Sequence, residues 1–182
     1  MKHLVNRARE GDAEEFILLM ERYSGAMYKV ARSILSNNED AADAIQETIL
    51  ICYEKISELK HPRFFKTWMT RILINACRGI LRQNSQSCLL GNFPDVPVRD
   101  ASIEYVEFQE LLGKLDEKYR LILILYYVQG LKIREIAGLL ELSENTVKTR
   151  LRRGRESLAE EYGISGEAPC AERKKGVSFY AK

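Results

Sequence analysis

A cluster of cations and neutral polar side chains near the C-terminal end of the sequence has the chemistry to contact DNA. Between Ser143 and Leu158 there are five Lys or Arg residues and only two acids. Asn and Thr stand among these cations, and such side chains reach base edges as well as phosphates. The candidate contact residues are Asn145, Lys148, Thr149, Arg152 and Arg153. A solvated helix face is the common explanation of a charge run, but the absence of a Glu-to-Lys ladder favours DNA binding.

The residues around this cluster predict two short helices joined by a tight turn. Ser143 is placed to accept a backbone N–H and so to cap the second helix. Apolar residues recur on one face of each helix, at Ile133, Ile136, Ala137 and Leu140 and then at Val147, Leu151 and Leu158. Gly154 stands where a side chain would crowd a neighbour. The pattern predicts a helix-turn-helix whose second helix lies in a DNA major groove.

A second basic segment runs from Leu59 to Pro94, where there is no Asp or Glu. Cations and aromatic residues alternate in it, at Lys60, Arg63, Phe64, Phe65, Lys66, Trp68, Arg71, Arg78 and Arg82. This combination is typical of a protein that binds single-stranded or opened nucleic acid. The alternative is that the aromatic residues are core, which we expect of most of them.

The preceding segment has the opposite charge. Its acids are Glu39, Asp40, Asp43, Glu47, Glu54 and Glu58, and only Lys55 opposes them. We expect one helix there, with its core face formed by Ile45, Ile49, Cys52, Ile56 and Leu59. The acidic face has the charge to dock a basic partner, although a solvated face is the more common explanation.

Helical patterns account for most of the remaining chain. Asp12 is placed to cap a helix whose apolar stripe continues to Ile34, and we interpret Asn37-Asn38 as its end. The apolar run from Leu121 to Val128 has the length of a strand or of a buried helix. We predict a helix because Asp116 and its neighbours form an N-terminal signal.

Composition and motifs exclude several classes of protein. The chain of 182 residues has a net charge of +2, so nucleic-acid binding requires local segregation of charge. Its four Cys and two His lack metal-ligand spacing, and no phosphate-binding loop or nucleophile motif is present. We therefore expect no catalytic residues, no cofactor and no metal. The first residues lack an apolar segment and no window is long and apolar enough for membrane insertion, so we expect no signal peptide and a cytoplasmic protein.

These patterns predict an all-α fold of two small helical domains joined by a flexible linker. The N-terminal domain is expected at residues 1–83 and the linker at 84–103, where Ser, Asn, Gly and Pro are frequent. The domain with the helix-turn-helix is expected at 104–162. A mobile tail is expected at 163–182.

Four segments in this order resemble an extracytoplasmic-function (ECF) sigma factor, a small bacterial RNA polymerase initiation subunit. They are DAADAIQETILICYEKI, FKTWMTRILINACRGILRQ, LDEKYRLILILYYVQGLKIREIAGLL and SENTVKTRLRRGRESL. The resemblance implies core RNA polymerase and promoter DNA as partners, and an anti-sigma factor as a further one. It implies polymerase contacts at Asp43, Gln46 and Glu47. It places minus-ten contacts at Lys60, His61, Arg63, Arg71, Asn75 and Arg78, and minus-thirty-five contacts on the helix-turn-helix residues given above.

The sequence departs from the family pattern in two loops. Glu141 stands where a turn glycine is common, so a left-handed conformation there would cost about 1 kcal/mol. The loop Lys60-His61-Pro62-Arg63 lacks the usual Arg-Gly pattern. Two other functions remain open from the residues alone: an operator-binding regulator, expected to dimerise, and a helical interaction module or unrecognised enzyme. Co-purification with core polymerase distinguishes these from the sigma-factor hypothesis.

Overall fold

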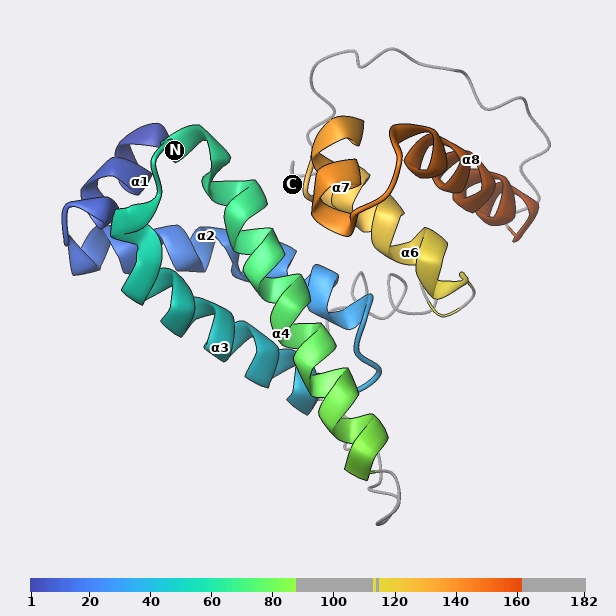
Figure 1. Ribbon diagram of the computed structural model, residues 1–182, viewed down its shortest axis with the longest axis horizontal. Helices are drawn as coiled ribbons and strands as arrows, with labels where there is room; N and C mark the ends of the chain where they lie inside the picture. Colours follow the sequence, from blue (N-terminus) through green and yellow to red (C-terminus); the bar gives the residue numbers. More distant parts are fainter. Residues whose placement is uncertain (88–112, 114, 162–182) are drawn as a thin grey trace, which may run out of the picture.

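The computed structural model describes residues 1–87, 113 and 115–161, and the regular structure in these ranges is helical, without a strand (Figure 1). The long helices of the N-terminal part are α1 (Lys2–Arg9), α2 (Ala13–Arg32), α3 (Asn38–Lys55) and α4 (Phe65–Ser87). The short turns η1 (Ile56–Glu58) and η2 (Pro62–Phe64) connect α3 to α4. The C-terminal part contains α6 (Glu117–Leu123), the π-helical segment η3 (Ile124–Val128), α7 (Ile133–Leu140) and α8 (Glu144–Glu161). The all-α prediction is confirmed, whereas the tail at 163–182 and most of the linker lie outside the described residues.

Side-chain caps fix where α2 and α3 begin. The Asp12 carboxylate accepts the Glu15 backbone N–H at 3.2 Å, as predicted. Asn37 accepts the Asp40 backbone N–H at 2.6 Å and so begins α3, whereas α2 ends at Arg32. The interpretation of Asn37-Asn38 as the end of the preceding helix was wrong, because the amide oxygen satisfies a free N–H of the following helix.

The core face of α3 is formed mainly by small residues. Ala41, Ala44, Thr48 and Cys52 are buried, whereas the predicted Ile45 and Ile49 are only partly buried. The Thr48 hydroxyl is satisfied inside the helix, since it donates to the Ala44 carbonyl at 2.7 Å. The buried face of α3 is therefore turned about the helix axis from the predicted one, which had been centred on the larger side chains. Cys52, Ile56 and Leu59 are buried as expected.

The apolar run Leu121–Val128 is a helix, as predicted, and its second half widens into a π-helical turn. The Gln129 backbone N–H donates to the Ile124 carbonyl, five residues earlier, at 3.0 Å. Four successive residues of this run, from Ile122 to Leu125, are buried.

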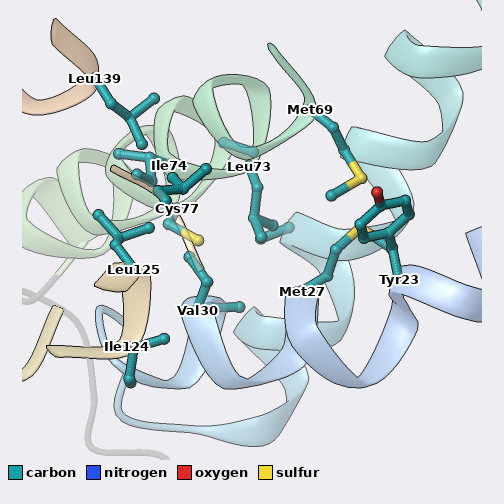
Figure 2. Packing of buried hydrophobic residues seen from close by; sticks show 14 of the residues in the cluster. Tyr23, Met27, Val30, Met69, Leu73, Ile74, Cys77, Ile124, Leu125 and Leu139 are labelled. Carbon is teal, nitrogen blue, oxygen red and sulfur yellow. The ribbon is translucent and has the colours of Figure 1, made fainter. Parts of the chain in front are cut away.

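The N-terminal and C-terminal parts share one apolar core. Figure 2 shows Val30 of α2 and Cys77 of α4 together with Ile124 and Leu139 of the C-terminal part. Two cations of α4 add polar contacts across the same interface, which are made to backbone carbonyls. Lys66 Nζ donates to the Gln129 carbonyl at 2.7 Å, and Arg71 donates to the Gly138 carbonyl at 2.9 Å.

Candidate nucleic-acid interface

The turn between α7 and α8 is short, as the sequence predicted. Glu141 is left-handed, with φ of 58°, and ends α7. The Thr146 backbone N–H donates to the Ser143 hydroxyl at 3.0 Å, so Ser143 caps α8 as expected. The helix-turn-helix therefore begins its second helix at a defined residue, and this fixes the direction of α8.

α8 presents two different faces. Val147, Leu151 and Gly154 are buried against the rest of the C-terminal part. The five candidate contact residues of the helix-turn-helix, Asn145, Lys148, Thr149, Arg152 and Arg153, are all exposed. Their spacing along α8 puts them on one continuous face opposite the buried residues. This polar face is free of apolar side chains and suits a DNA groove.

Gly154 sets the distance between α8 and α6. A Cβ added at Gly154 would lie 2.9 Å from Leu123 Cδ1 and 3.2 Å from Tyr119 Cβ. The backbone of α8 therefore approaches α6 more closely than any other residue type permits without movement of a neighbour. The sequence prediction of a close approach at Gly154 is confirmed.

Arg152 has an intramolecular partner that sequence analysis did not anticipate. Its guanidinium donates to Glu156 Oε1 at 2.6 Å, one helical turn further along α8. Both side chains are about half exposed or more, at 61% and 47%. Such exposed pairs within a helix contribute only roughly 0.3–0.5 kcal/mol, so a phosphate or a base edge can replace Glu156 at small cost.

A groove beside α8 adds residues that the sequence did not single out. Asn145, Thr149 and Arg153 line this groove of about 410 Å³ together with Lys118 and Tyr119 of α6. The Lys118 ammonium is hydrogen-bonded and ion-paired with Asp116, and this raises the pKa of Lys118. Lys118 and Tyr119 belong to a segment that we had interpreted only as a helix start, so no pattern marked them as contact residues.

The candidate minus-ten residues fall into separate groups. Asn75 and Arg78 are exposed on α4, and Asn75 lines a cleft of about 360 Å³ that also contains Glu47 of α3. His61 and Arg63 line a different groove, with Lys2 and Asn6 of α1 as its other wall. Lys60 is exposed in the same loop as His61. Arg71 is exposed but donates to the carbonyl of Gly138. The described structure thus does not gather these six residues into one pocket.

The exposed face of α3 carries acidic residues followed by two large apolar side chains. Asp43, Gln46 and Glu47 are exposed, as a docking surface requires. Leu50 and Tyr53 follow within two helical turns and are 64% and 59% exposed. Sequence reasoning missed this pair, because Leu50 does not fall on the stripe predicted for the core.

The two described cysteines are buried and are not disulfide-bonded. Burial raises the pKa of Cys52 and of Cys77 to about 12, so both thiols are neutral at physiological pH. Among residues 1–87, 113 and 115–161 there is no group of three or more His, Cys, Asp or Glu side chains arranged to hold a metal ion. None of the helices in these ranges has the length and hydropathy needed to cross a membrane.

The comparison with known proteins identifies the family. The family description "Sigma-70 region 2" matches residues 19–86, which include α3 and α4, and "Sigma-70, region 4" matches residues 105–158, which include the helix-turn-helix. The chain is 30% identical over 152 residues to the ECF sigma factor SigM of Mycobacterium tuberculosis, covering 82% of this chain and 78% of SigM. The chain belongs to the ECF sigma factors. Sigma factors are DNA-binding regulators, and this one directs promoter-specific transcription initiation with RNA polymerase.

Other ECF sigma factors agree with this assignment along most of the chain. SigW of Bacillus subtilis is 28% identical over 177 residues, covering 87% of this sigma factor and 94% of SigW. The solved structure of CnrH in complex with the cytosolic domain of CnrY is similar with a TM-score of 0.64 and 25% identity, covering 91% of this sigma factor and 98% of CnrH. The resemblance inferred from the four sequence segments is confirmed.

Proposed function

We propose that this sigma factor reads its promoters with two surfaces, a duplex-reading face on α8 and a single-strand-reading face on α4 and the loop before it. The observation that carries the proposal is the clean division of α8: five predicted contact side chains are exposed, and Val147 and Leu151 on the other side are buried. Arg152 and Arg153 have the donors for a guanine edge, and Lys148 has the charge for a phosphate. We assign these residues, with Asn145 and Thr149, to the minus-thirty-five element.

Reading the minus-ten element requires an extruded base. Unstacking a base costs on the order of a few kcal/mol, which a protein offsets by gripping the base or its backbone. Asn75 is an exposed amide in a cleft, so it is suited to hydrogen-bond a base edge. We assign the contacts to the flanking phosphates and bases to Arg78, Lys60, His61 and Arg63. Arg71 uses one N–H group on the Gly138 carbonyl, and its other donors can join them on the strand.

The acidic face of α3 is proposed to dock on core polymerase. Asp43, Gln46 and Glu47 supply charge, and Leu50, being 64% exposed, supplies an apolar contact that becomes buried on binding. An anti-sigma partner is proposed from the structure of CnrH, which is in complex with CnrY. The site of action is proposed to be the cytoplasm, where the polymerase works. Residues 1–83 and 104–162 are proposed as the two functional domains, with 84–103 as linker and 163–182 as tail.

The test separates the two DNA surfaces by substitution. Run-off transcription from a genomic promoter library, with the sigma factor and purified core polymerase, first identifies a promoter that this sigma factor uses. Arg152→Ala is then expected to weaken binding to the matched minus-thirty-five duplex by roughly 1–3 kcal/mol, and to weaken a scrambled duplex much less. Asn75→Ala is expected to leave duplex binding intact and to reduce permanganate reactivity of melted thymines in the minus-ten element.

Arg22→Ala is the matched control, because Arg22 is an exposed cation on α2 that lines none of the three grooves described above. It should change neither duplex binding nor melting. The proposed division is wrong if Asn75→Ala weakens closed-duplex binding and spares melting, or if no specific transcript is made with core polymerase.

A further inference from the structure

The helix α1 forms one wall of a polar groove that lies beyond the assigned surfaces. α1 packs against the turns between α3 and α4 (Figure 1), with Val5 and Ala8 buried. Lys2 and Asn6, one helical turn apart, line a groove of about 320 Å³ whose opposite wall is His61, Pro62 and Arg63. The match to sigma-70 region 2 begins at residue 19, so α1 stands outside it. The sequence patterns singled out neither Lys2 nor Asn6.

The electrostatics of this groove favour an anion. Lys2 and Arg63 are exposed cations on opposite walls, and in the part of the chain that the structure describes neither is paired with an acid. Another basic residue on α1, Arg7, is engaged by Asp12 at 2.7 Å and is directed toward the start of α2. Two unpaired cations across a groove concentrate positive potential where low-dielectric walls limit screening.

Aromatic groups beside the groove indicate which anion fits. Phe64 is 42% exposed, with the Arg63 guanidinium 4.6 Å from its ring centroid and the His61 ring 6.0 Å away. Planar groups of this kind stack with bases, while the cations follow the backbone. Asn6 adds a neutral amide that can donate to a phosphate or sugar oxygen. Single-stranded nucleic acid satisfies all three features, whereas an acidic peptide uses only the cations.

We infer that the groove between α1 and the loop His61–Arg63 binds the sugar-phosphate backbone of the opened promoter strand, with Lys2 on a phosphate and Asn6 on a neighbouring oxygen. This inference rests on the proposed minus-ten role of the loop. It extends the strand-binding surface onto α1, so that the loop holds the strand from one side and α1 from the other.

The experiment titrates the full chain against a short fluorescein-labelled oligothymidylate, followed by anisotropy at several salt concentrations. Loss of one phosphate contact on a single strand reduces the slope of log affinity against log salt by about 0.7. Lys2→Gln is expected to show this reduction, which corresponds to an affinity loss of about fivefold at 0.1 M salt relative to 1 M. Asn6→Ala is expected to weaken binding without changing the slope, because it removes no charge. Arg22→Gln removes the same charge from an exposed residue outside the groove and should change neither quantity.

The outcomes distinguish this inference from the proposed minus-ten role. If Arg63→Gln reduces the salt slope and Lys2→Gln does not, the loop binds the strand and the role of α1 is refuted. If neither changes it, or if the wild-type chain does not bind the oligonucleotide, both ideas are refuted. Equal effects of Lys2→Gln and Arg22→Gln would indicate general charge attraction and overturn the site. Competition by a polyglutamate peptide as effective as unlabelled oligothymidylate would assign the groove to an acidic protein partner instead.

Discussion

Replacing Gly154 by alanine tests whether the close contact between α8 and α6 holds α8, the proposed DNA-reading helix, in place. The added methyl group would meet Leu123 Cδ1 at 2.9 Å and Tyr119 Cβ at 3.2 Å, and both residues belong to α6. The Leu123 side chain can rotate only into other packed atoms, since it is 6% exposed. Tyr119 Cβ is fixed by the backbone of α6, so α8 itself must shift.

Two opposing effects set the magnitude. Alanine is favoured over glycine inside a helix by about 1 kcal/mol. Overpacking of a well-filled site costs roughly 1–3 kcal/mol. The matched control is Gly25→Ala in α2, where an added Cβ has no heavy atom within 4 Å. Gly25→Ala should therefore be stabilising by about 1 kcal/mol, whereas Gly154→Ala should range from neutral to about 2 kcal/mol destabilising.

Urea unfolding followed by circular dichroism measures both free energies of unfolding, and a duplex-binding titration follows the function. Gly154→Ala should also weaken binding to the minus-thirty-five duplex, since displacement of α8 moves Asn145, Thr149 and Arg153 together. Gly25→Ala should leave duplex affinity unchanged. Equal stabilisation by the two substitutions would refute the close approach of α8 to α6, and unchanged duplex affinity would refute its role in positioning the polar face.

Three further predictions concern other parts of the chain. Glu141→Gly should raise the free energy of unfolding by about 1 kcal/mol in urea titrations, because glycine adopts the left-handed conformation without strain. Cys52 and Cys77 should resist iodoacetamide at pH 8 in the folded chain, as peptide mapping will reveal. Burial raises the pKa of both thiols to about 12 in the folded chain. The two neutral thiols therefore contribute fully to the stability of the fold below the pKa of an unfolded thiol, and this contribution is lost as the pH rises toward about 12. Asp43→Lys combined with Glu47→Lys should weaken the affinity for core polymerase without changing the melting temperature, whereas Glu21→Lys on α2 should leave that affinity unchanged.

Local signals in the sequence were sufficient for the helix-turn-helix. Ser143 and Asp12 were predicted as caps because a cap requires only a side-chain oxygen and the next few backbone N–H groups. The crowded Gly154 was also predictable, since it depends on the periodicity of its own helix, whereas a left-handed conformation at Glu141 was raised only by comparison with the family pattern. Asn37 was misinterpreted because asparagine can cap either end of a helix. Only the structure shows that its amide oxygen accepts the Asp40 backbone N–H and so caps the following helix.

Contacts between distant segments were not predictable from patterns. Lys66 and Arg71 donate to backbone carbonyls, and a carbonyl carries no signature in the sequence. The core face of α3 was misplaced because Ala41 and Ala44 are short enough to allow close packing, yet they are weak signals beside Ile45. The groove between α1 and the loop before α4 joins residues that are far apart in the chain, and its α1 wall alone has the pattern of an ordinary solvated surface.

The apolar contact between the two parts of the chain makes their association sensitive to temperature. Separation of the parts would expose Val30, Cys77, Ile124 and Leu139 to water, and exposure of apolar surface raises the heat capacity. The attraction between such groups weakens on cooling. Cooling therefore weakens the apolar contribution to the association of the two parts of the chain.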